Sequence, residues 1–396
     1  MISSRRTSPS GGRSGRRVLA AVAAATALSS LAACGGGGSS APAAPENVIA
    51  EGKAPDYYPA EYSQIIEGSK AEGGQLTIYS NTDQENWAPI FRDFQKKYPW
   101  VTNIAANNLD SDEVFQRVLS EQATGNSPAD VLVSNAAQAW AEYAEDPNRL
   151  ATYSSPEVAK LPDFATLMPN VYAMSMDPMT IAYNTALVPE APTGLASLAK
   201  IVEQDPAKFK DKITTRDING AFGFTVSHAF TEADPNSWAS LEKLLPLARP
   251  ETSSGTQTEK ILSGEYLAGF FISAAPAYPV VDDSSGLFQV TFLDDGTVVL
   301  PRGIGIAPKA PHANTSKLFL DFVLSSEGQR AVAEGGLTAY CDDVKAAPGL
   351  HTYQEVVDKV GHQNVIPVKY ALVPDAQVQE FTQRWDGLLG SKPTAG

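Results

Sequence analysis

Apolar side chains near residue 75 follow two spacings, one after the other. Residues 75–80 have the β-branched and aromatic content of a buried strand. Residues 81–83 (Asn-Thr-Asp) follow as turn and cap residues, and apolar residues then recur every three or four positions until Pro99. This order predicts a strand, a polar turn and an amphipathic helix, which form the first half of a βαβ unit.

The same alternation continues along the chain. We expect strands at residues 101–105 and 129–133, a helix at 112–124, and a further helical stretch that Ser134 and Asn135 open. Strands that alternate with helices predict a mostly parallel sheet with right-handed crossovers. Ligands of such α/β sheets bind at the carboxyl ends of the strands.

Two extended apolar runs, residues 179–184 and 298–306, predict a crossing into a second lobe and a return from it. Between them we expect strands at 212–215 and 266–272, and a helix that residues 253–256 open. Further helices are predicted at residues 316–324, 353–360 and 376–388. A chain that leaves one sheet, builds another and returns has two connections between its lobes. Such a double hinge permits closure around a ligand.

The first 33 residues have the pattern of an export signal. Five arginines precede an apolar run at residues 18–33, which is shorter than the roughly twenty residues that span a bilayer. The run ends in Leu-Ala-Ala before Cys34, which is the pattern of a lipobox. We therefore predict signal cleavage and acylation at Cys34, while a twin-arginine or a general secretory route both stay open. Residues 35–42 are too poor in apolar side chains to fold and predict a tether.

These patterns divide the chain into five parts. We predict a signal peptide at 1–33, a lipid-anchored tether and lead-in at 34–72, the first part of lobe 1 at 73–180, lobe 2 at 181–300, and the second part of lobe 1 with the C-terminal helices at 301–396.

Charge and cysteine content narrow the function classes. The chain has a net charge of −15, and loss of the five signal arginines takes the mature chain to −20, which argues against nucleic-acid binding. Cys341 has no partner once Cys34 is acylated, so we expect no intramolecular disulfide. We interpret Cys341 as a small buried thiol.

Four segments carry a family likeness in sequence order. They are Leu76–Ser80 with Phe94 and Tyr98-Pro99; Asp112-Glu113 with Arg117, Glu121, Gly125 and Ala129–Val131; Ala182–Thr185; and residues 310–314 with 317–325 and 327–329. Together with the lipobox, this order resembles the ferric-iron-binding-like branch of type 2 periplasmic binding proteins.

The resemblance implies an α/β fold of two lobes, each a mostly parallel sheet with flanking helices, joined by a double-crossing hinge. It also implies a monomer without a cofactor or enzymatic activity, which binds a small solute and docks on the permease and ATPase subunits of an importer. The chain would act on the extracytoplasmic face of the cell membrane, held there by its lipid alone.

Ferric iron is the alternative ligand that the resemblance suggests. Iron-binding members of the branch hold the ion with two adjacent tyrosines, a histidine and an acid. The corresponding stretch here, residues 270–278, contains only Tyr278, and Asp83 stands near the expected histidine. The four histidines are scattered without the short spacing of a metal motif.

Hydroxyl, amide and guanidinium groups gather at the predicted element ends. A helix N-terminus has unpaired N–H groups and suits a carboxylate, phosphonate or phosphate, although Ser, Thr and Asn are also ordinary helix caps. Arg216 and Arg302 would pair with a planar oxyanion in a bidentate manner. Phe222 and Phe224 are candidates for an aromatic wall. The predicted ligand-binding residues are Ser80, Asn81, Thr82, Ser134, Asn135, Thr215, Arg216, Ser254, Gly255, Thr256, Ser273, Tyr278 and Arg302.

Two other function classes compete with solute binding. A secreted hydrolase needs a nucleophile beside a base, but residues 125–129 lack the final glycine of a Gly-x-Ser-x-Gly motif. The acid pairs at 282–283 and 294–295 lie in turn-rich stretches. A ligand sensor or scaffold with the same fold would leave the same residues behind.

Overall fold

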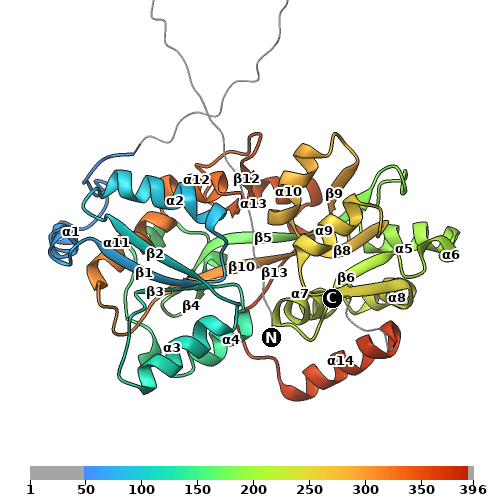
Figure 1. Cartoon of the computed structure of the whole chain (residues 1–396), viewed down its shortest axis with the longest axis horizontal. Coiled ribbons are helices and arrows are strands. Elements are labelled where there is room, and N and C mark those ends of the chain that lie inside the picture. The colour runs from blue at the N-terminus through green and yellow to red at the C-terminus, as the bar shows by residue number, and fades with distance from the viewer. Residues whose placement is uncertain (1–48, 391–396) are drawn as a thin grey trace, which may run out of the picture. The chain divides into compact units, whose positions relative to one another are not determined.

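Two long strands, β5 (Val171–Asn184) and β10 (Thr297–Ile306), form the centre of the sheet in the computed structural model (Figure 1). The structure describes residues 49–390, so the predicted signal peptide, Cys34 and residues 34–48 of the predicted tether lie outside the described residues. Eleven of the described strands form one sheet with the order β2-β1-β3-β10-β5-β8-β6-β7, to which β13, β4 and β9 add.

The other strands are short, and helices separate many of them along the chain. The strands are β1 (Gln75–Ser80), β2 (Asn103–Asn108), β3 (Val131–Ser134), β4 (Thr166–Met168), β6 (Ile213–Arg216), β7 (Ala248–Glu251), β8 (Ala268–Ser273), β9 (Phe288–Phe292), β11 (Thr338–Ala339), β12 (His351–Thr352) and β13 (Val365–Pro367). The helices are α1 (Tyr62–Ala71), α2 (Gln84–Lys97), α3 (Glu113–Ala123), α4 (Ala137–Tyr143), α5 (Leu195–Gln204), α6 (Pro206–Phe209), α7 (Ala221–Ala233), α8 (Trp238–Leu244), α9 (Ser254–Leu262), α10 (Ala274–Asp283), α11 (Ala313–Leu324), α12 (Ser326–Glu334), α13 (Tyr353–Val360) and α14 (Asp375–Leu389).

Each end of the sheet belongs to one α/β lobe. β1 pairs in parallel with β2 and β3, and β6 pairs in parallel with β7 and β8. Residues 172–178 of β5 pair antiparallel with β10, whereas residues 179–184 pair with β8 and β9. β5 therefore passes from one lobe into the other, and all fourteen of its residues are buried. This is the two-lobe α/β fold that the sequence predicts.

The predicted crossings lie within β5 and β10, as expected. The predicted lobe limits, after Thr180 and after Leu300, fall inside these two strands, and we retain them as a proposal. Outside the crossings, α13 has the predicted bounds, and β1 does as well.

Several predicted starts were wrong by two or three residues, namely those of β2, β3, β8, α4 and α11. Two of these errors have a clear cause. β2 begins at Asn103 instead of residue 101, because the amide of Val101 closes a turn onto the Tyr98 carbonyl before the chain can pair with β1. α4 begins at Ala137 instead of Ser134, because Ser134 is still paired with β10 as the last residue of β3.

The sequence patterns did not predict several of the helices, among them α1, α5 and α7. α7 is the clearest case, since seven of its thirteen residues are buried, and they include Gly223, Thr225 and Ser227. Small and polar residues that are buried on a helix weaken the apolar period that a sequence pattern detects.

Alternate side chains of β1 and β3 face two different helical layers. Ile78, Val131 and Val133 pack in one cluster with Trp87 of α2 and Phe319 of α11. Tyr79 and Leu132 pack in another cluster with α3 and α4. Because successive strand residues point to opposite faces, helices cover the lobe 1 sheet on both sides.

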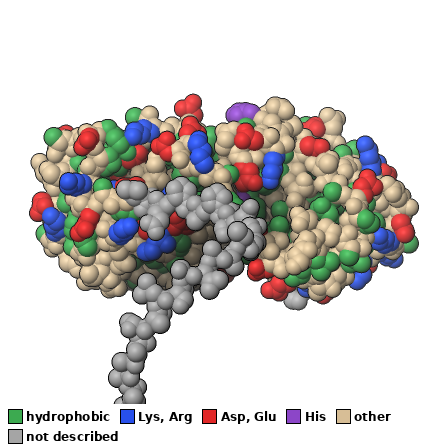
Figure 2. Space-filling model, turned by 90° about the horizontal axis from the view of Figure 1, so that it is seen from above, with side chains coloured by type: hydrophobic (Ala, Val, Ile, Leu, Met, Phe, Trp, Pro, Cys, Tyr) green, Lys and Arg blue, Asp and Glu red, His purple; other side chains and the backbone are tan. Residues whose placement is uncertain are grey.

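Charged side chains are spread over the surface of the described part. On the face in Figure 2, Lys and Arg side chains are interspersed with Asp and Glu. Between residues 49 and 390, no helix combines the length and the apolar character that a membrane crossing requires.

A buried carboxylate fixes the lead-in to lobe 1. Asp321 on α11 is 1% exposed, and its Oδ2 accepts hydrogen bonds from Tyr62 (2.7 Å) and Tyr153 (2.6 Å). Burial raises the pKa of Asp321 to about 6, although these hydroxyls favour the charged form. Its Oδ1 has no hydrogen-bond partner among the described residues.

We predict that Asp321→Asn flattens the pH dependence of stability. A carboxyl whose pKa is raised in the folded state stabilises the fold below its unfolded pKa of 3.8, and this contribution is lost as the pH rises through about 6. The amide oxygen of Asn can still accept both tyrosine hydrogen bonds. The free energy of unfolding of the variant, relative to wild type, should therefore rise by about 2 kcal/mol between pH 4 and pH 7. Urea unfolding at four pH values measures this, and parallel curves would contradict it.

A tyrosine hydroxyl closes a gap in the hinge ladder. The β5–β10 register shifts between Arg302 and Gly303. There the Tyr370 hydroxyl donates to the Pro301 carbonyl (2.8 Å) and accepts from the Gly303 amide (3.0 Å). Gly303 leaves no room for a side chain, because a Cβ would lie 2.7 Å from the Trp140 ring nitrogen.

Tyr370→Phe should destabilise the fold by about 1–3 kcal/mol, since it leaves buried backbone groups of the hinge without partners. Tyr353→Phe on α13 is a matched control that lies outside the hinge. Thermal unfolding of both variants provides the measurement. A loss for Tyr353→Phe as large as that for Tyr370→Phe would show that the hinge hydrogen bonds contribute nothing special.

Candidate ligand-binding site

A cavity of about 640 Å³ receives side chains from both lobes and from the two crossing strands. β5 and β10 contribute Asp177 and Arg302, while β6 contributes Arg216. The other lining residues are Asn81, Asp83, Glu85, Asn86, Asn108, Leu109, Asp110, Ser111, Asn135 and Leu337 from lobe 1, and Phe222, Thr252, Ser253, Ser254, Gly255, Ser273, Ala275, Pro276 and Pro279 from lobe 2.

Arg302 is fixed in the wall by the predicted strand-end residues. Its Nη1 donates to Asn81 Oδ1 at 2.6 Å, and Asn81 Nδ2 donates to Asn135 Oδ1 at 2.7 Å. The guanidinium is 9% exposed, and its Nε has no hydrogen-bond partner among the described residues. Burial lowers the pKa of Arg302, while Asp177 acts in the opposite direction.

Arg216 ends β6 and brings a second guanidinium to the cavity from lobe 2. It lies over the ring of Phe222, 4.5 Å from the centroid, and is 9% exposed. Its Nε and Nη1 have no hydrogen-bond partner in the part of the chain described. Burial lowers the pKa of Arg216 to about 10, so the group is still charged at neutral pH.

Hydroxyl groups line the lobe 2 side. Ser253 caps α9, because its Oγ accepts from the Thr256 amide at 3.4 Å. Ser254 Oγ accepts from the Ser273 amide at 3.1 Å, and the Ser273 hydroxyl donates to Asp177 Oδ2 at 2.5 Å. These bonds join the start of α9 to the end of β8 and to the crossing strand β5.

The structure thus brings seven of the predicted residues together: Asn81, Asn135, Arg216, Ser254, Gly255, Ser273 and Arg302. Five others do not line this cavity. Ser80, Thr82 and Thr215 are buried; Ser134 donates to the Ser111 carbonyl; and Thr256 contributes its amide to the cap of α9.

Tyr278 lies away from the cavity, which corrects its predicted position. Ala275, Pro276 and Pro279 are the α10 residues that line the cavity, and the ring of Tyr278 points to another side of the helix. There its ring stacks on His351 of β12, with 3.4 Å between the centroids. Within the stretch 270–278, the cavity meets Ser273, Ala275 and Pro276, and none of these has a phenol.

Asp177 and Asp110 are cavity acids that the sequence does not single out, whereas Asp83 is noted only as the residue near the expected histidine. Asp177 lies two residues before the predicted crossing at 179–184, and its only signal is a charge in a largely apolar stretch. Asp110 follows β2, and the rule that ligands bind at strand ends would have found it if the end of β2 had been placed at Asn108.

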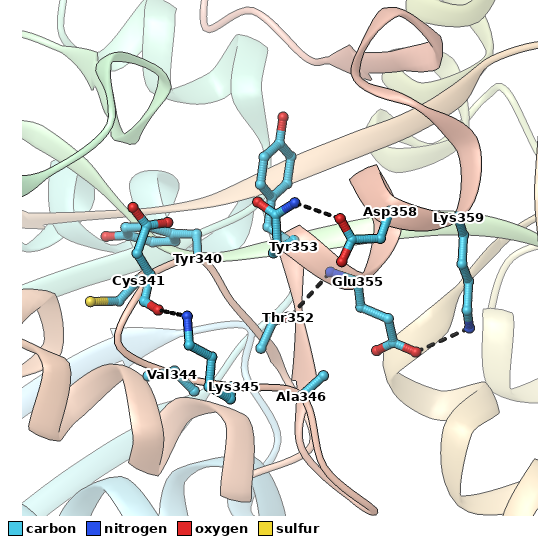
Figure 3. A pocket seen from close by; sticks show the side chains of 12 residues that line it. Tyr340, Cys341, Val344, Lys345, Ala346, Thr352, Tyr353, Glu355, Asp358 and Lys359 are labelled. Atoms are coloured by element: carbon cyan, nitrogen blue, oxygen red, sulfur yellow. Dashed lines mark hydrogen bonds and ion pairs between the residues drawn. The ribbon is translucent and has the colours of Figure 1, made fainter.

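A second cavity, of about 730 Å³, lies between residues 340 and 359 (Figure 3). Its charged groups are paired with their neighbours: Lys359 with Glu355 at 3.0 Å, Lys345 with the Asp342 carbonyl at 2.5 Å, and Asp358 with Gln354 at 2.7 Å. Cys341, which is partly exposed, lines this cavity. Arg216 and Arg302, whose N–H groups lack partners among the described residues, line the cavity of about 640 Å³, and we therefore take that cavity as the candidate ligand site.

Metal ligands do not gather in the described residues. Between residues 49 and 390, no group of three or more His, Cys, Asp and Glu side chains is placed to hold a metal ion.

The comparisons with known proteins agree with the two-lobe fold. Residues 89–356 match the family described as bacterial extracellular solute-binding proteins. The chain belongs to this family, whose members bind small solutes for ABC importers and act with permease and ATPase subunits. Iron uptake protein A1 of Synechocystis is 25% identical over 294 residues, which cover 68% of this chain and 76% of that protein.

Solved structures show the same fold at lower identity. The substrate-binding protein of an ABC transporter from Agrobacterium tumefaciens is 19% identical with a TM-score of 0.69, over 80% of this chain and 95% of that one. AfuA from Actinobacillus pleuropneumoniae, with fructose-6-phosphate bound, is 18% identical with a TM-score of 0.61, over 80% of this chain and 98% of that one. Iron-bound HitA from Pseudomonas aeruginosa is 17% identical with a TM-score of 0.61, over 79% and 99%.

Proposed function

We propose that this chain is the lipid-anchored solute-binding protein of an ABC importer and that its solute is a small organic anion. The observation that carries the proposal is the pair of arginines in one cavity, each 9% exposed and each with N–H groups that lack a partner. A buried guanidinium N–H without a hydrogen-bond partner is costly, and an oxyanion that accepts from it removes the cost.

Carboxylates, phosphonates and phosphates fit these two groups best. A guanidinium forms two parallel hydrogen bonds to a planar pair of oxygens, and Ser253, Ser254 and Ser273 supply hydroxyls beside it. An anionic site inside a mature chain of charge −20 needs such local cations, because the net charge repels anions.

The positions of the arginines also provide a mechanism for closure. Arg302 is tied to lobe 1 through Asn81, and Arg216 belongs to lobe 2. A solute held by both arginines favours the closed form, because only a ligand with differential affinity for two states shifts their equilibrium. The closed form then docks on the permease.

Ferric iron or a ferric complex is the second candidate. The relative from Synechocystis is named an iron uptake protein, and a FutA structure from Trichodesmium that matches the fold contains iron and citrate. The cavity wall contains no tyrosine, which argues against binding of the bare ferric ion. A ferric complex of an organic acid would instead present carboxylates to the two arginines.

The remaining features of the proposal concern the whole chain. We infer a monomer without enzymatic activity, which is anchored to the extracytoplasmic face of the membrane through Cys34 alone. The family supports solute binding over the activity of a hydrolase. A sensor with the same fold would bind the solute without delivering it to a permease.

Arg302→Ala and Arg216→Ala should each weaken binding of the organic anion by about tenfold to a hundredfold, since hydrogen bonds to charged groups contribute about 1.5–3 kcal/mol. A thermal-shift screen of carboxylates, phosphonates, sugar phosphates and ferric citrate selects the anion, and calorimetric titration of the mature chain measures its affinity. Arg384→Ala is the matched control, because Arg384 contacts Glu242 and Trp238 outside the cavity.

Two outcomes would contradict this proposal. Equal affinities for the two cavity variants and wild type would show that the arginines do not hold the solute. A shift with ferric salts alone, unchanged in both variants, would favour the metal ion.

Cys34→Ala should abolish acylation and release the chain from the membrane fraction, since no other anchor is proposed. Metabolic labelling with a fatty acid, fractionation, and the mass of the N-terminal peptide measure this. Cys341→Ala is the control and should keep the label. An unmodified Cys34 in the wild-type protein would refute the lipid anchor.

A further inference from the structure

The cavity contains one buried acid among its cations. Asp177 lies opposite Leu300 in the β5–β10 ladder, and Arg302 lies opposite Ser175. Residues two apart on a strand share a face, so Asp177 and Arg302 are diagonal neighbours on the same face of the hinge. Both line the cavity.

Only one oxygen of Asp177 has a hydrogen-bond partner. Oδ2 accepts from the Ser273 hydroxyl, whereas Oδ1 has no partner among the described residues. The side chain is 6% exposed. Burial raises the pKa of Asp177, while Ser273, Arg302 and the first amides of α10 act against the increase. The amides of Ala274 and Ala275 at the start of α10 thus favour the charged carboxylate, while no side chain among the described residues donates to Oδ1.

This arrangement places an acceptor in the cavity that also contains the unpartnered N–H groups of Arg216 and Arg302. A simple anion bound by Arg216 and Arg302 would leave Oδ1 unpaired, and its own oxygens would repel the carboxylate. A solute with a hydroxyl or ammonium group near its anionic group would instead donate to Oδ1. An unpaired acceptor in a binding site discriminates strongly against an analogue that lacks the donor.

We propose that Asp177 selects the solute: the ligand is an organic anion with a hydroxyl or ammonium donor, which binds Asp177 Oδ1 while Arg216 and Arg302 hold the anionic group. This inference rests on the proposed function and narrows its solute class. The acids Asp83, Glu85 and Asp110 line the same cavity and add negative potential, which suits an ammonium group.

Matched ligands test the assignment on the mature wild-type chain. The first set is ethylphosphonate, 2-hydroxyethylphosphonate and 2-aminoethylphosphonate; the second is propionate, 3-hydroxypropionate and β-alanine. Within at least one set, we expect a donor-bearing ligand to bind at least tenfold more tightly than its parent. Calorimetric titration at constant ionic strength measures the ratio, and the preferred donor distinguishes a hydroxyl from an ammonium solute.

Two variants separate selection from a structural role. Asp177→Ala should reduce the preference for the donor to less than twofold while the parent anion still binds. Asp177→Asn keeps a neutral acceptor, so it should retain a hydroxyl preference and lose an ammonium preference. Asp358→Asn on α13 is the control acid, since its carboxylate accepts from Gln354 outside this cavity, and it should keep the wild-type ratio.

The outcomes distinguish this inference from the function on which it rests. If the parent and donor-bearing anions bind the wild type equally, the selection by Asp177 is wrong and the anion site stands. If Asp177→Ala weakens all the anions alike, Asp177 only supports α10 and the hinge. If no anion in either set and none in the wider screen binds, the proposed function fails, and this inference fails with it.

Discussion

The antiparallel pairing of β5 with β10 is the constraint on which the rest of the molecule depends. Within residues 49–390, these two strands lie at the centre of the sheet, with β3, β1 and β2 on one side and β8, β6 and β7 on the other. Their ladder is buried along its whole length, and where its register shifts, Tyr370 completes the backbone hydrogen bonds. The pairing of the two crossing strands is therefore well packed along its whole length.

The same ladder positions the candidate site. A strand pair that crosses between two lobes presents one face to the space between them, and Asp177 and Arg302 lie on that face. The strand ends of lobe 1 supply Asn81 and Asn135, and β6 supplies Arg216 from lobe 2. Buried polar groups without a partner are costly, and those of Asp177, Arg216 and Arg302 lie in one cavity, which makes it the candidate site.

Much of this site follows from the sequence through one rule. Polar residues after parallel strands converge at one edge of the sheet, which led to Asn81, Asn135 and Ser273, while Ser254 was predicted as part of a helix N-terminus. The rule was too broad at Ser80 and Ser134, because the last residue of a strand is often still buried in the ladder. It also missed Asp110, because the end of β2 was placed too early.

The sequence by itself determined the alternation of strands and helices, the two crossings and the two arginines, because local periodicity and rare charges in apolar runs are visible in one dimension. Only the tertiary structure decided which residues meet. Tyr278 faces away because the turn of α10 points it toward His351, and Asp177 enters the cavity because the register of β5 with β10 puts it on the face of Arg302. Side-chain direction depends on register and packing between segments that are far apart in the chain, and no local pattern contains that information.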